Sequence, residues 1–268
     1  GAGNLSSLLP ATPTPTAAYF RSPSTTTSAV VASFTVAILS LAIPLAARLL
    51  GRDPTAAARL AHQVAASAVS VRGAALFLVA QCLIGLAILL QFNWFAVALG
   101  AASLLLVAAY PFMKRITWWP QAWLGLTFNW GALLGFAAAS GHLSWPAVLL
   151  YASGVFWTLG YDTIYAHQDK EDDALIGVRS SALRLGAHVK AGVTIFYALA
   201  LGCWAGAFWL LRPQLLGLAA LMPAALHFAW QISSLQVSNG DDALAKFRSN
   251  RFAGLLVAMA CAVVGSTA

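Results

Sequence analysis

The sequence predicts an all-α fold, a bundle of transmembrane helices with eight visible spans. Of its 268 residues 60% are hydrophobic and only 9% are charged, whereas a soluble domain carries about 25% charged residues. The apolar residues form runs of about 20, the length that crosses the hydrocarbon core of a bilayer as a helix. The strands of a transmembrane barrel would instead alternate apolar and polar residues with a period of two.

We expect each of the eight apolar runs to form one helix. A tail rich in Ser, Thr and Pro precedes them over residues 1–28 and is expected to be extended or disordered. The polar break over 236–251 is expected to be a solvated loop. The runs cover residues 29–50, 73–90, 92–112, 119–139, 146–166, 190–211, 214–235 and 252–267.

The distribution of basic residues predicts the orientation in the membrane. The net charge of +7 comes from short, separate breaks, a pattern typical of membrane topology and not of a nucleic-acid surface. By the positive-inside rule the basic breaks lie on the cytoplasmic side of the lipid bilayer. Thirteen of the fifteen Lys and Arg residues lie in the breaks 48–72, 113–118, 167–190 and 236–251.

One acidic stretch stands out because five of the eight carboxylates of the chain lie between Asp162 and Asp173. If the preceding helix continued through it, Asp162, Tyr165, Asp169 and Asp173 would share one face. Carboxylates at this spacing repel one another, so the ladder indicates a bound cation. Oxygen ligands favour Mg²⁺ with a substrate diphosphate. The alternative is a polar loop that its own basic residues neutralise.

Two further groups of residues are candidates for substrate binding. Lys114 and Arg115 follow a span, where basic residues usually fix topology. The acidic stretch on the same face favours a binding role, and a guanidinium can contact two phosphate or carboxylate oxygens. Asn129 lies inside a span, where it either orients a substrate or joins two helices by a hydrogen bond.

The acidic stretch and the residues 176–183 that follow it resemble the second aspartate-rich motif of the UbiA-type membrane prenyltransferases. Residues 110–115, 118–121 and 247–250 are also similar to that family. We therefore expect a UbiA-type transmembrane domain over residues 67–268.

The resemblance implies transfer of a polyprenyl group from polyprenyl diphosphate to the ring of 4-hydroxybenzoate in ubiquinone biosynthesis. It implies Mg²⁺ as cofactor and a bacterial inner membrane as location, with the mitochondrial inner membrane as the alternative. The candidate residues are then Asp169 and Asp173 as metal ligands, Arg115, Asp162 and Tyr165 in catalysis, and Lys114, Arg115, Asn129 and Tyr165 in substrate binding.

The N-terminal quarter departs from the family. Members have nine spans and an earlier motif of the form Asn-Asp-x-x-Asp-x-x-x-Asp, whereas Asp53 is the only carboxylate of residues 51–63 here. We hypothesise that residues 1–66 are not the family's native N-terminal region, through a frameshift or a misplaced start. Loss of the first motif is expected to weaken or abolish transfer.

Two other functions are also compatible with the sequence. An ion-coupled transporter would use the carboxylates to handle ions, although such residues usually lie near the bilayer midplane and not at the end of a span. An inactive UbiA-like membrane subunit would bind a partner, and the missing first motif is the feature that favours it.

Overall fold

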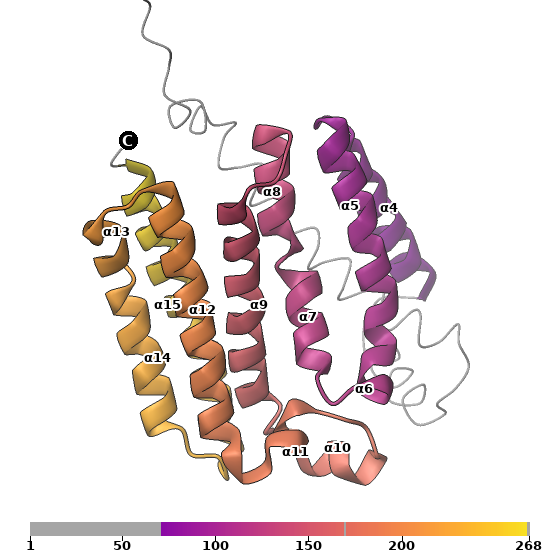
Figure 1. The fold of residues 1–268 in the computed structure, drawn as a ribbon. Helices are drawn as coiled ribbons and strands as arrows, with labels where there is room; N and C mark the ends of the chain where they lie inside the picture. The colour runs from indigo at the N-terminus through magenta and orange to yellow at the C-terminus, as the bar shows by residue number, and fades with distance from the viewer. Residues whose placement is uncertain (1–70, 169, 267–268) are drawn as a thin grey trace, which may run out of the picture.

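The computed structural model describes residues 71–168 and 170–266, and within these ranges it contains helices and no strand (Figure 1). The expected all-helical fold is therefore confirmed for this part of the chain. The tail, the run over 29–50 and Asp53 lie outside the described residues. The α-helices are α4 (Val71–Leu89), α5 (Trp94–Ala109), α6 (Met113–Ile116), α7 (Pro120–Phe128), α8 (Trp130–Ser140), α9 (Trp145–Tyr165), α10 (Lys170–Ile176), α11 (Ser181–Leu185), α12 (Val189–Leu211), α13 (Leu215–Ala219), α14 (Met222–Ser234) and α15 (Gly240–Ser266), with 3₁₀ turns η2 (Tyr110–Phe112) and η3 (Gly186–His188).

The described helices include five stretches that are long and apolar enough to cross a membrane, and the chain is an integral membrane protein. A sixth apolar stretch, Ala75–Leu89, is shorter. The predicted run over 146–166 corresponds to α9, which is 21 residues long but carries polar residues such as Thr158, Asp162 and Thr163. The five stretches are Trp94–Ile116, Pro120–Ser140, Ser181–Leu211, Leu215–Ser234 and Gly240–Ser266.

Helix α9 lies at the centre of the bundle and packs against α7, α8, α12 and α15 (Figure 1). Glycines allow these close approaches. A Cβ on Gly125 of α7 would come within 2.9 Å of the Val155 carbonyl oxygen. A Cβ on Gly160 would overlap the ring of Tyr197 on α12. The position of α9 therefore depends on residues that leave no room for a side chain.

Gly154 provides a test of this packing. A Cβ there would collide with the Asn129 carboxamide, so we expect Gly154→Ala to destabilise the protein by about 1–3 kcal/mol, the usual cost of overpacking. Gly202→Ala is the matched control, because a Cβ at Gly202 meets nothing within 4 Å, and alanine favours a helix. Thermal unfolding in detergent measures both. Equal melting temperatures for the two variants would contradict the predicted contact.

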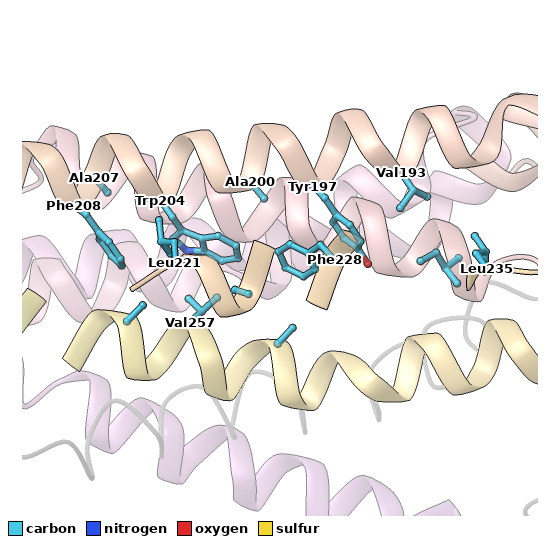
Figure 2. Close-up of a cluster of buried hydrophobic side chains, with 14 of the residues drawn as sticks. Val193, Tyr197, Ala200, Trp204, Ala207, Phe208, Leu221, Phe228, Leu235 and Val257 are labelled. Carbon is cyan, nitrogen blue, oxygen red and sulfur yellow. The ribbon is translucent and has the colours of Figure 1, made fainter. Parts of the chain in front are cut away.

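Aromatic residues of α12 and α14 form the largest described core, together with α15 (Figure 2). Phe228 stacks on Tyr197 with ring centroids 4.2 Å apart, and Trp204 lies 6.3 Å from Phe228 on a nearly parallel plane. This core fixes α15 against α12, and α15 also packs on α9. The start of α15 is thereby held beside the end of α9.

The polar break over 236–251 is not the expected loop, because α15 already begins at Gly240. The side chain of Asn239 accepts hydrogen bonds from the backbone N–H groups of Asp241 and Asp242, at 3.0 and 3.2 Å. Asp242 also pairs with Lys246 one turn later, at 3.0 Å. An Asn cap, acidic residues in the first turn and an i,i+4 ion pair each stabilise a helix start.

Candidate functional site

The acidic stretch does not continue α9 as one helix, so the expected single-helix ladder is wrong. Helix α9 ends at Tyr165 and α10 begins at Lys170. The intervening turn is tightened by bonds from the His167 and Gln168 N–H groups to carbonyls three residues earlier, at 3.2 and 3.0 Å. Such bonds between residues three apart are typical of the tightened last turn of an α-helix. Asp162 and Tyr165 therefore come from α9 and Asp173 from α10.

Lys114 and Asp173 bring the basic pair and the acidic stretch together. The Lys114 ammonium lies 3.4 Å from the Asp173 carboxylate, although 59 positions separate the two residues. Asp173 is only 6% exposed, and a buried carboxylate is costly without a cation beside it. Helices α6, α10 and α11 lie at one end of the bundle, which we call the charged end (Figure 1).

Arg115 is the neighbour of Lys114 on α6, and its side chain is exposed. Consecutive helical residues point about 100° apart, so one member of the pair faces Asp173 and the other does not. The ion pairs of the described residues are Lys114–Asp173 and Lys246–Asp242. Arg115 is thus available to an added ligand, and its role in substrate binding stays a prediction.

Asp162 lies near the last turn of α9 and is half-buried. Its carboxylate interacts electrostatically with the phenols of Tyr110, on η2, and Tyr161. The Tyr161 hydroxyl donates to the Thr158 hydroxyl oxygen at 3.2 Å. The interaction with Tyr110 relates the end of α9 to the segment that carries Lys114.

An aromatic wall, formed by Trp157, Tyr161, Tyr165 and Phe247, runs along α9 and α15. The Phe247 ring lies 4.5 Å from that of Tyr165 and 5.7 Å from that of Tyr161. The Trp157 indole N–H donates to Asn250 Oδ1 at 2.9 Å and so ties α9 to α15. Aromatic faces attract positive charge. Phe247 was not among the predicted site residues, although the resemblance of residues 247–250 pointed to this segment, and its role in the site is a prediction.

Asn129 lies at the junction of α7 and α8, where one predicted span is divided into two helices. Its Nδ2 donates to the Gly125 carbonyl at 2.9 Å and to the Thr158 hydroxyl oxygen at 2.8 Å. These contacts join α7 to α9, which agrees with the interhelical alternative. A role of Asn129 in substrate binding stays a prediction.

His167 lies in the turn after α9. Its Nδ1–H donates to the Thr163 carbonyl at 2.9 Å, so Nε2 carries the lone pair. Nε2 is buried and has no hydrogen-bond partner among the described residues. Burial lowers the pKa of His167 below its usual 6.5, with Lys170 adding to the effect and the backbone hydrogen bond opposing it. The ring is therefore neutral near pH 7.

The described residues alone do not complete a metal centre. No group of three or more His, Cys, Asp or Glu side chains in this part of the chain could hold a metal ion. Asp173 supplies one carboxylate, which already faces Lys114, while Asp169 lies outside the described residues. A Mg²⁺ site with Asp169 and Asp173 as ligands stays a prediction.

The UbiA prenyltransferase family matches residues 7–256 of the chain. Curated relatives include the proteins named mitochondrial 4-hydroxybenzoate polyprenyltransferase from Arabidopsis thaliana, 50% identical over 182 residues, and from Homo sapiens, 47% identical over 205 residues. These alignments cover 68% and 72% of this chain, and 45% and 53% of the relatives. The chain spans about half the length of the curated relatives that it matches. The hypothesis on the origin of residues 1–66 stays a prediction.

Two solved structures share the fold. The apo structure of a UbiA homologue from Aeropyrum pernix K1 has a TM-score of 0.66 at 20% identity, covering 91% of this chain and 93% of that one. A digeranylgeranylglyceryl phosphate synthase has a TM-score of 0.59 at 17% identity, with 89% and 83% covered. At these identities the likeness shows the fold alone.

Proposed function

Because the chain belongs to the UbiA prenyltransferase family, we propose that it transfers a polyprenyl group from polyprenyl diphosphate to the ring of 4-hydroxybenzoate in ubiquinone biosynthesis. The names of its relatives support this acceptor. The observation that carries the proposal is the convergence of Lys114 and Asp173 at the charged end. This places a fixed cation and a buried carboxylate together beside the exposed Arg115.

The reaction breaks the bond between the allylic carbon and the diphosphate oxygen and forms a bond from that carbon to the aromatic ring. Negative charge builds up on the leaving diphosphate, and Lys114 and Arg115 stabilise it there. Positive charge builds up on the allylic carbon, and the aromatic wall on α9 and α15 stabilises it. The proton of the substituted ring carbon then passes to an oxygen of the released diphosphate, and the apolar helices take up the prenyl tail.

The proposal includes a divalent cation and a membrane. Members of the family generally use divalent metal ions to bind diphosphate substrates, and Mg²⁺ with Asp169 and Asp173 is the choice we propose. We also propose a mitochondrial membrane, because the relatives are named as mitochondrial enzymes. They lend no support to the expected bacterial inner membrane.

Membranes that contain the full chain provide the test. We expect prenylated 4-hydroxybenzoate to form from polyprenyl diphosphate when Mg²⁺ is present, and EDTA to abolish it. The rate should be low, because the family carries its first aspartate motif in the region of residues 51–63, where this chain has Asp53 as its only carboxylate. Mass spectrometry of the lipid extract measures the product, with membranes that lack the chain as control.

Absence of product at every Mg²⁺ concentration would contradict the proposal and favour an inactive subunit. Proteoliposomes that conduct ions without forming product would favour a transporter. Asp173 belongs to α10, which is outside the helices long enough to cross the membrane, and this position speaks against the transporter.

A further inference from the structure

The segment Gly177–Ser181, which we call the strap, connects α10 to α11 and turns the chain back over the charged end. Gly177 has a φ of 76°, which glycine adopts without strain. The Val178 N–H donates to the Asp173 carbonyl at 3.0 Å, the bond that closes a helix in a Schellman motif. The start of the strap is therefore hydrogen-bonded to the backbone of Asp173, the residue whose carboxylate faces Lys114.

Arg179 attaches the strap to α6. Its backbone N–H donates to the Lys114 carbonyl at 2.9 Å, and its Nη1 donates to the Ile116 carbonyl at 2.6 Å. Both carbonyls belong to a helix of only four residues, which cannot satisfy them internally. The guanidinium also lies 5.4 Å from the centre of the Trp118 ring. Arg179 thus caps the helix that presents Lys114 and Arg115.

Gln121 attaches the other end of the strap. Its Oε1 accepts from the Ser181 backbone N–H at 3.2 Å, and Gln121 is only 4% exposed. The Ser181 hydroxyl also contacts the Thr163 hydroxyl on α9 at 2.8 Å. The strap is therefore fixed to α6, α7 and α9.

We propose that Arg179 and Gln121 are positioning residues, which hold α10 in register with α6 so that Asp173 meets Lys114. Neither side chain belongs to the ion pair. Arg179 contacts the Ile116 carbonyl, and Gln121 contacts the Ser181 N–H group. This inference rests on the proposed function, because the pair that it positions is the one that the transfer reaction uses. Displacing a reacting group by about 1 Å can lower a rate about 100-fold, so modest loosening of the strap is enough.

Kinetics of four variants test the proposal. Arg179→Ala removes the Ile116 contact, and Gln121→Met removes the acceptor while nearly keeping its size; each is expected to lower kcat/KM roughly 10- to 100-fold. Gln121→Glu keeps an acceptor oxygen and, because burial favours the neutral acid, should restore most of the activity when it is assayed near pH 6. Arg184→Ala is the matched control, since Arg184 is an exposed cation of α11 outside the strap contacts.

A distance measurement reports on the strap without substrate. Spin labels at the exposed positions Ile116 and Ala174 should give a narrow distance distribution in the parent chain without native cysteines. The distribution should broaden in Arg179→Ala and in Gln121→Met, and stay narrow in Gln121→Glu and Arg184→Ala. The background replaces the native cysteines Cys82, Cys203 and Cys261 with serine.

The inference is overturned if the distance distribution of either loosened variant matches that of the parent, or if kcat/KM is unchanged. It is also overturned if Gln121→Glu loses as much activity as Gln121→Met. If the parent chain has no transferase activity, the proposed function is wrong. The spin-label distances then still decide whether the strap holds α10 to α6.

Discussion

Asp173→Asn will lower kcat/KM for prenyl transfer by about 100-fold or more, while the protein stays folded. The substitution keeps the size of the side chain and removes its charge. Asp173 is 6% exposed and faces the Lys114 ammonium at 3.4 Å, so a neutral amide changes the field where the diphosphate is expected to bind. Loss of one well-placed electrostatic group commonly costs 100- to 1,000-fold. Incorporation of a labelled prenyl group into 4-hydroxybenzoate in membranes measures the effect.

Asp241→Asn is the matched control, because Asp241 is exposed in the first turn of α15 and forms no ion pair among the described residues. Its activity should equal that of the parent chain. Asp169→Ala should resemble the Asp173 variants if Asp169 is the second ligand. Full activity of Asp173→Asn would remove this carboxylate from the mechanism.

Gln231→Met should destabilise the protein by about 1–3 kcal/mol. Gln231 is fully buried and connects three helices. Its Oε1 accepts from the Tyr197 hydroxyl at 2.6 Å, and its Nε2 donates to the Ser249 hydroxyl oxygen at 2.9 Å and to His227 Nε2 at 3.1 Å. Methionine fills the space but removes the acceptor of the buried Tyr197 hydroxyl, while Ser249 and His227 stay in contact with each other at 3.2 Å. Loss of a buried hydrogen-bond partner costs about 1–3 kcal/mol. The melting temperature in detergent should fall by roughly 5–10 °C.

A double variant separates the hydrogen bonds from packing. Gln231→Met leaves the Tyr197 hydroxyl without its acceptor, and Tyr197→Phe removes that hydroxyl. The two changes together should therefore cost less than the sum of the single changes. Gln214→Met serves as control, because Gln214 is exposed between α12 and α13. Additive losses in the double variant, or an unchanged melting temperature for Gln231→Met, would contradict the network.

The positions of the helices could be predicted because apolar composition alone sets where a chain enters and leaves a membrane. Helix ends depend on local hydrogen bonds that hydropathy does not record. Asn129 divides the run over 119–139 through its bonds to Gly125 and Thr158, and Asn239 starts α15 twelve residues before the predicted span. The break after Tyr165 likewise involves local bonds, and it placed Asp162 and Asp173 on two different helices.

By itself, the sequence determined that the chain is a membrane protein and that its few charges are grouped, because both follow from composition and order along the chain. It also carried the motifs by which the family could be named. Only the tertiary structure decided that Lys114, and not Arg115, meets Asp173, and that Phe247 faces Tyr165. Such contacts join residues far apart in the chain, so they depend on how helices pack and rotate, which no local pattern specifies.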